Sequence, residues 1–131
     1  MSKKKKEESI WNRAPAQEDY EAARRFLSLL FSDRDAAHLA SLLRRPPIVF
    51  FEAKDLLQAA QCHLLEKDSP HVAADLKKIA KGKKLSPVLL VRGQARVGVP
   101  LIIADGHHRI CASWYWQEDE PVACCIAPVP R

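Results

Sequence analysis

SPVLLVRGQARVGVPLIIADGHHRICASWYWQ, residues 86–117, contains the most informative pattern of the sequence. Two short apolar runs, Val88–Val91 and residues 99–104, flank a polar segment with two glycines, which is typical of two strands joined by a loop. The second run ends at Asp105 and Gly106, a common turn dipeptide, and a helical pattern follows over residues 109–116. This stretch therefore predicts a strand hairpin, a tight turn and a helix.

Helical patterns precede the hairpin. Apolar residues recur at helical spacing over residues 17–31, and Ser32 or Asp33 begins a second helix that ends before two prolines at 46 and 47. Together they predict an N-terminal helical hairpin. Residues 53–61 favour another helix, and a further one begins at Ser69 and Pro70 and ends near Gly82.

Two more strands complete the expected fold. Residues 48–51 form a short apolar and aromatic run, and residues 122–126 form a closing one. Helices come first, and strands with an inserted helix follow, which predicts an α+β fold with a small mixed sheet. We expect residues 1–14 to be a basic disordered tail and residues 15–131 to be one domain, with the helical hairpin at 15–45 and the core at 46–131.

The basic charge of the chain is concentrated at its beginning. The 131 residues have a formal net charge of +5, and residues 1–13 contain five basic and two acidic residues. The body alone is only weakly basic, which disfavours a nucleic-acid reader. The lysine run is interpreted as a solvated tail or as an electrostatic tether to DNA or anionic lipid. Trp11, beside it, either docks a partner or anchors the tail to the body.

No targeting or membrane signal is evident. The lysines are followed by Glu7, Glu8 and Ser9 rather than by an apolar run, which is unlike a secretory signal. No apolar run is long enough to span a bilayer. We therefore expect a cytoplasmic protein that does not bind a membrane.

The cysteines are expected to be reduced. The chain contains Cys62, Cys111, Cys124 and Cys125, and none of them forms a CxxC pair. Adjacent residues of a strand point to opposite faces, so Cys124 and Cys125 should enter different layers. A zinc site can be drawn from Cys62, His63 and His71, but these residues lack paired ligand spacing, and no metal site is predicted.

The turn at Asp105 and Gly106 is the candidate site. The first amides of a helix have no intrahelical acceptor, and the helix dipole favours negative charge there. A glycine lets a ligand approach the backbone, Arg109 offers a planar set of donors for phosphate oxygens, and His107 or His108 could donate to phosphate or transfer a proton. The pattern indicates an anion site. The alternative is that Asp105 simply caps the helix and the histidines hold no ligand.

With these residues and SPVLLVRGQARVGVPLIIADGHHRICASWYWQEDEPVACCIA as a whole, the chain resembles the ParB/sulfiredoxin-like superfamily over residues 69–127. Residues 48–57 correspond to the opening strand and helix of the family. The resemblance implies a ParB/sulfiredoxin-like topology and a turn that holds the phosphates of a nucleotide, such as ATP, ADP or CTP, with Mg²⁺. Carried over, the phosphate loop would consist of Gly106, His107, His108 and Arg109.

Departures from the family narrow the implied activity. His107 stands where sulfiredoxins have their reacting cysteine, so sulfinic acid repair is not expected. Partition proteins resemble Gly-Glu-Arg-Arg here and continue into a DNA-reading helix-turn-helix, whereas this sequence ends at Arg131, so DNA is a weak candidate partner. Asp-Gly-His-His-Arg is most similar to the free serine kinase version, in which an acidic residue elsewhere acts as base. Glu52 is the candidate for that role.

The expected function is binding of a nucleotide or another phosphorylated small molecule at this turn. If phosphoryl transfer or nucleotide hydrolysis follows, Asp105, His107, His108 and Glu52 are the candidate catalytic residues, and Lys84 at the end of a lysine cluster could reach a polyphosphate. The alternatives are a non-catalytic regulatory or interaction module, with a protein partner or a homodimer through the N-terminal helices, and a structural domain with an empty turn. The sequence leaves the nucleotide, any acceptor and the oligomeric state open.

Overall fold

The computed structural model of the chain describes residues 9–129. Its sheet contains β1 (Val49–Glu52), β2 (Val88–Val91), β3 (Ile102–Asp105) and β4 (Pro121–Ala127), in the order β1-β4-β2-β3. β4 pairs in parallel with β2 and antiparallel with β1, and β2 pairs antiparallel with β3. The fold is therefore α+β with a small mixed sheet, as the sequence predicts.

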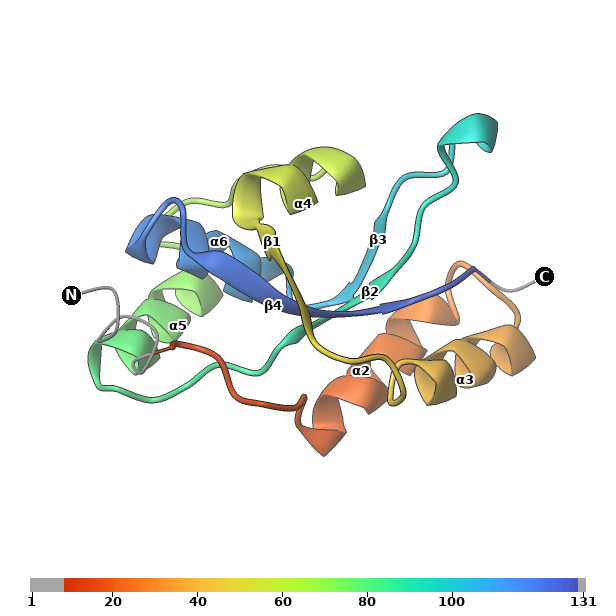
Figure 1. Cartoon of the computed structure of the whole chain (residues 1–131), viewed down its shortest axis with the longest axis horizontal. Helices are drawn as coiled ribbons and strands as arrows, with labels where there is room; N and C mark the ends of the chain where they lie inside the picture. Colours follow the sequence, from red (N-terminus) through yellow and green to blue (C-terminus); the bar gives the residue numbers. More distant parts are fainter. Residues whose placement is uncertain (1–8, 130–131) are drawn as a thin grey trace.

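Helices cover both faces of the sheet (Figure 1). α2 (Gln17–Leu27) and α3 (Asp33–Leu42) precede β1 and pack against one face as the expected helical hairpin. α4 (Ala53–Ala60), α5 (Pro70–Ala80) and α6 (His107–Trp116) pack against the other face. Ser32 caps α3 by accepting a hydrogen bond from the Asp35 amide at 3.1 Å.

The two layers of helices produce two apolar cores, one on each side of the central strands. Leu90 and Cys124 belong to the core beneath α4–α6, whereas Leu89 and Cys125 belong to the core beneath α2 and α3. Strands that are buried on both faces need apolar side chains at every position, which explains the continuous apolar runs of β2 and β4. The four cysteines are free, and burial raises the pKa of Cys124 to about 12. Cys124 and Cys125 face opposite layers, as the sequence predicts.

Several element boundaries differ from those expected. α2 ends at Leu27 instead of residue 31, because residues 28–31 form a turn, and β1 spans Val49–Glu52 instead of residues 48–51. β3 begins at Ile102 instead of residue 99, because the loop between β2 and β3 contains a short 3₁₀ helix, η1 (Ala95–Val97), and a bridge between Gln94 and Val99. α6 begins at His107 instead of residue 109, so both histidines of the motif lie in its first turn.

The beginning of the described chain is ordered. Ile10 and Trp11 are buried, Trp11 pairs with Leu85 as an isolated parallel bridge, and its Nε1–H donates to the Pro121 carbonyl at 2.9 Å. Residues 9–14 therefore do not belong to a disordered tail, because a buried tryptophan anchors them to the body. The lysine run at residues 3–6 lies outside the described residues.

The helices are too short or too polar for a bilayer. Between residues 9 and 129, none of them combines the length and the apolar character that crossing a membrane requires.

Candidate functional site

A hollow of about 540 Å³ ends at the predicted turn. One wall is apolar and includes Phe26 of α2, Leu30 in the turn after α2 and Ile102 of β3. The end of the hollow is polar and is formed by Gly106, His107 and His108. Three elements that are far apart in the sequence, α2, the end of α4 and β3, thus meet at the first turn of α6.

Gly106 shapes the polar end. Its φ of +118° is rarely adopted by other residues, and a Cβ atom there would lie 2.5 Å from Cγ1 of Val88. No side chain of the described residues caps α6 at this glycine. The Ile110 amide donates to the Gly106 carbonyl at 3.0 Å, so the amides of His107, His108 and Arg109 come before the first intrahelical hydrogen bond.

The guanidinium of Arg109 is held by groups of the protein itself. Its Nη2 donates to Asp105 Oδ2 at 2.9 Å and lies 3.9 Å from Asp19 Oδ2 on α2. Its Nε is buried without a hydrogen-bond partner within residues 9–129. The sequence predicts a direct phosphate contact from Arg109, whereas in the structure its guanidinium pairs with Asp105 and Asp19, which makes it a positioning residue that ties the turn to α2.

The Asp105 carboxyl group is half-buried beside this guanidinium. Burial raises its pKa, Arg109 opposes this increase, and Asp19 adds to it. The pairing with Arg109 corrects the expectation that Asp105 is a free catalytic carboxylate. Its oxygen is already used to hold Arg109 across one turn of backbone.

The two histidines at the turn have different environments. His107 Nε2 lies 2.9 Å from the His63 carbonyl oxygen, and since a carbonyl only accepts, this nitrogen carries the proton. The ring of His108 lies 4.7 Å from that of His71 on α5. Burial lowers the pKa of His108, with further lowering from His71 and His107, while Asp75 opposes the change. His108 therefore favours the neutral form at neutral pH.

Asp75 and His71 of α5 also belong to this cluster, although the sequence does not predict them as site residues. Burial raises the pKa of Asp75, and Lys78, Arg109, His108 and His71 counteract it in that order. The two residues are four apart on α5 and share one face of the helix, which the sequence does indicate. That this face meets the start of α6 depends on tertiary packing.

Two other predicted site residues lie elsewhere. Glu52 is at the end of β1, the edge of the sheet opposite β3, and its nearest cation is the exposed Lys54 at 3.8 Å. Lys84 donates to the Ser9 carbonyl at 2.7 Å and lines hollows beside the N-terminal segment. Neither side chain lines the hollow at Gly106, so their assignment to this site is corrected.

The donor set does not fit a metal centre. Within residues 9–129, no group of three or more His, Cys, Asp and Glu residues is placed to hold a metal ion. Cys62, His63 and His71 thus do not assemble into the zinc site that can be drawn from the sequence. At Asp105, Oδ2 is paired with the Arg109 guanidinium.

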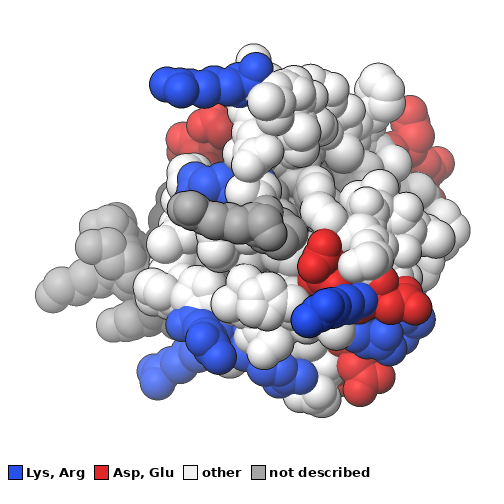
Figure 2. Space-filling view, turned by 90° about the vertical axis from the view of Figure 1, so that its right-hand side faces the viewer, with Lys and Arg blue, Asp and Glu red and all other residues white. Residues whose placement is uncertain are grey.

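The surface charge on one side of the molecule is mixed. Figure 2 shows Lys and Arg side chains interspersed with Asp and Glu and separated by uncharged residues. Proteins that bind nucleic acid through phosphate contacts concentrate basic residues on one face. The face in Figure 2 does not have such a patch.

Comparisons with known proteins leave the chemistry to be inferred from the site alone. The chain matches no model of a known protein family, no curated protein and no solved structure.

Proposed function

We propose that the chain binds a phosphorylated small molecule, with a nucleotide as the leading candidate, in the hollow between α2, β3 and the start of α6. The observation that carries this proposal is that the hollow ends at a helix N-terminus that no side chain of residues 9–129 caps. Amides without an intrahelical acceptor and the positive end of the helix dipole both favour phosphate oxygens. The phosphate contacts would come from the first turn of α6 and from His107 and His108.

The apolar wall favours a nucleotide over inorganic phosphate. Phe26 is 42% exposed and Leu30 is 55% exposed, although both lie at the edge of a hollow. Aromatic and aliphatic faces of this kind stabilise a flat base or another apolar group. A ligand with one apolar part and one anionic part would use both ends of the hollow.

The resemblance to the ParB/sulfiredoxin-like superfamily supports the same ligand class. The order of elements α5, β2, β3, Gly106, α6 and β4 is the order that the resemblance implies. In that family the equivalent turn holds nucleotide phosphates. The present turn differs because Arg109 binds carboxylates, so the backbone and the histidines would supply the phosphate contacts.

Nucleotide hydrolysis or phosphoryl transfer is the second candidate. It rests on the lowered pKa of His108, because a neutral imidazole at the end of the hollow can accept a proton from a hydroxyl group or water. Without such chemistry the chain is a binding module. Release of phosphate from ATP or CTP that His108→Ala abolishes would favour the enzyme, whereas saturable binding without turnover would favour the module.

Binding is tested by titrating ¹⁵N-labelled protein with ATP, ADP, CTP and inorganic phosphate, with and without Mg²⁺. We expect saturable shifts of the amides of His107 and His108, with tighter binding of a nucleotide than of phosphate. Phe26→Asp should weaken nucleotide binding about tenfold or more through loss of the apolar wall. Leu29→Asp is the matched control, because Leu29 is 82% exposed on the adjacent loop and does not line the hollow. Absence of saturable shifts with every ligand would overturn the proposal.

A further inference from the structure

The exposed edge of the sheet at β1 is apolar. Val49, Phe50 and Phe51 are 37%, 56% and 43% exposed. An edge strand presents unpaired backbone groups on one side, and natural proteins usually protect such edges with charged side chains or proline. Pro46 and Pro47 limit the length of this edge, but its middle consists of three consecutive apolar side chains.

A hollow of about 670 Å³ adjoins this edge. Ile48 and Phe50 line it from the strand, and Trp11, Arg13 and Lys84 are among the residues that complete it. Alternate residues of a strand share a face, so Phe50 lies on the face of this hollow and Phe51 on the other. An added strand would therefore cover apolar side chains on both faces.

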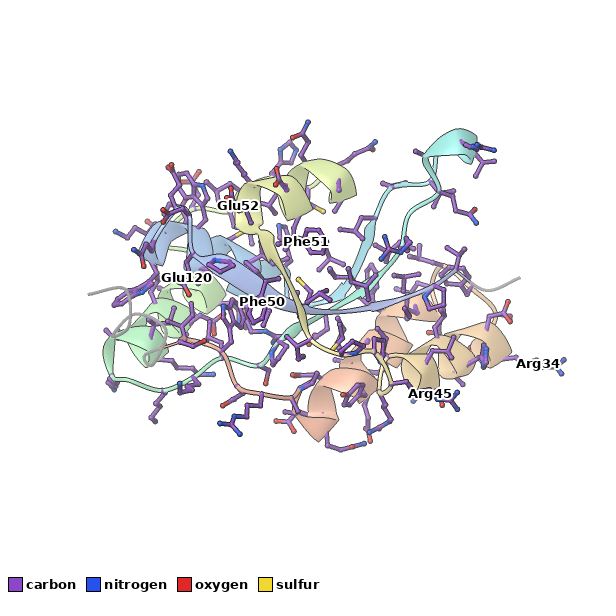
Figure 3. All side chains as sticks on the ribbon, viewed as in Figure 1. Arg34, Arg45, Phe50, Phe51, Glu52 and Glu120 are labelled. Atoms are coloured by element: carbon purple, nitrogen blue, oxygen red, sulfur yellow. The ribbon has the colours of Figure 1, made fainter. Side chains whose placement is uncertain are left out.

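The two ends of the edge carry opposite charge (Figure 3). Arg45 lies four residues before the start of β1, whereas Glu52 ends the strand. Arg44 is used within the chain, since it lies over the Tyr20 ring and donates to Gln17, whereas Arg45 is exposed. The ion pair between Glu52 and Lys54 is long and exposed, so it restrains Glu52 weakly.

We propose that two copies of the chain associate through β1, as antiparallel edge strands related by a two-fold axis. In an antiparallel arrangement, Arg45 of each copy lies toward the end of β1 that carries Glu52 in the other copy. In a parallel arrangement, residues of like charge would lie together. The shared sheet would satisfy the backbone groups of β1 and cover Phe50 and Phe51. This surface differs from the N-terminal helices that the sequence interpretation considered, and it is independent of the proposed ligand site.

The interface is small, so the dimer is weak and depends on concentration. A strand of four residues with its flanking side chains covers less area than the roughly 1,200 Å² of a standard stable interface. Sedimentation velocity of the full chain from about 10 µM to about 1 mM therefore covers the range in which the dimer forms. We expect the sedimentation coefficient to increase with concentration. Phe50→Lys should abolish this increase, and Leu29→Lys, the same change at a loop residue that is 82% exposed, should preserve it.

A charge exchange tests the orientation with little risk to folding, because both side chains are exposed or half-exposed. Arg45→Glu alone and Glu52→Arg alone should each weaken association by about tenfold, since the two-fold axis repeats each contact. The double variant with both changes should restore association to within about threefold of the original. A monomer across the whole concentration range, a dimer that Phe50→Lys leaves intact, or failure of the double variant to restore association would overturn the proposal. Addition of an extended segment of another protein to β1 without self-association would also overturn it.

Discussion

Gly106 is a position at which any other residue would be strained. Its positive φ disfavours a side chain, and the neighbouring Val88 leaves no room for a Cβ atom. We predict that Gly106→Ala lowers the free energy of unfolding by about 3 kcal/mol, through the unfavourable φ and the contact with Val88. Gly82→Ala is the matched control. Its φ is +79°, and no atom would lie within 4 Å of a Cβ at that position, so only the backbone cost of about 1 kcal/mol applies. Urea unfolding followed by circular dichroism measures the free energy of unfolding of both variants. Equal losses in the two variants would show that Val88 moves aside at little cost.

The ionisation of His108 depends on two neighbours on α5 that act in opposite directions. Removal of the ring in His71→Ala should raise the pKa of His108, because the nearby charge and part of the burial are lost. Asp75→Asn should lower it further, since Asp75 favours the charged imidazolium. The pKa is measured from the His108 ring resonances by NMR. His38→Ala on α3 is the control and should leave the pKa of His108 unchanged. Shifts of the same sign in both variants would contradict this arrangement.

Asp75 also links stability to pH. Burial raises its pKa in the folded state, so the folded protein binds this proton more tightly than the unfolded chain does. The stabilising contribution is complete below the unfolded pKa near 3.8 and is lost as the pH rises through the folded pKa. Asp75→Asn should therefore gain stability relative to the original protein as the pH increases from about 4 to about 7. Urea midpoints of the original protein and of Asp75→Asn at these two pH values measure the gain, and an equal difference at both pH values would contradict the prediction.

At the scale of elements, the helix starts differ in how they are capped. Ser32 accepts a hydrogen bond from the Asp35 amide, whereas the Ser69 hydroxyl donates to the Glu66 carbonyl and does not cap α5. We predict that Ser32→Ala costs about 1 kcal/mol of unfolding free energy and Ser69→Ala less than about 0.5 kcal/mol. Thermal and urea unfolding of the two variants test this order, and the opposite order would mean that the hydroxyl of Ser69 matters more than the cap at Ser32.

The elements could largely be predicted from the sequence, because their signals are local. Continuous apolar runs predicted β2 and β4, and the serine and proline at 69 and 70 placed the start of α5 correctly. Val99 is apolar and therefore indicates an earlier start of β3, although it belongs to the loop around η1. The sequence predicts the start of α6 too late, since two histidines give no apolar periodicity that would indicate a helix.

At the scale of the whole molecule, the sheet order decides which candidate residues meet. β1 and β3 are at opposite edges of the sheet, so Glu52 and Gly106 are far apart. No local sequence pattern could indicate this separation. The same packing brings Asp19 of α2 to Arg109 and His71 of α5 to His108. The turn itself could be identified from the sequence, but its partners could not, because each one depends on how a distant helix packs.

Trp11 illustrates such a long-range contact, because it joins the start of the described chain to the last strand. We predict that Trp11→Phe, which retains most of the ring, costs about 1–2 kcal/mol through loss of the hydrogen bond to Pro121, and that Trp11→Ala costs about 3–5 kcal/mol. Trp116→Phe should cost less than about 0.5 kcal/mol, since Trp116 is 46% exposed. Urea unfolding followed by circular dichroism measures these losses, and cleavage after Arg13 by trypsin reports local release of the segment. If Trp11→Ala accelerates cleavage without lowering the free energy of unfolding, the segment detaches independently of the rest of the protein. If Trp11→Ala both accelerates cleavage and lowers the free energy of unfolding, the segment unfolds together with the core.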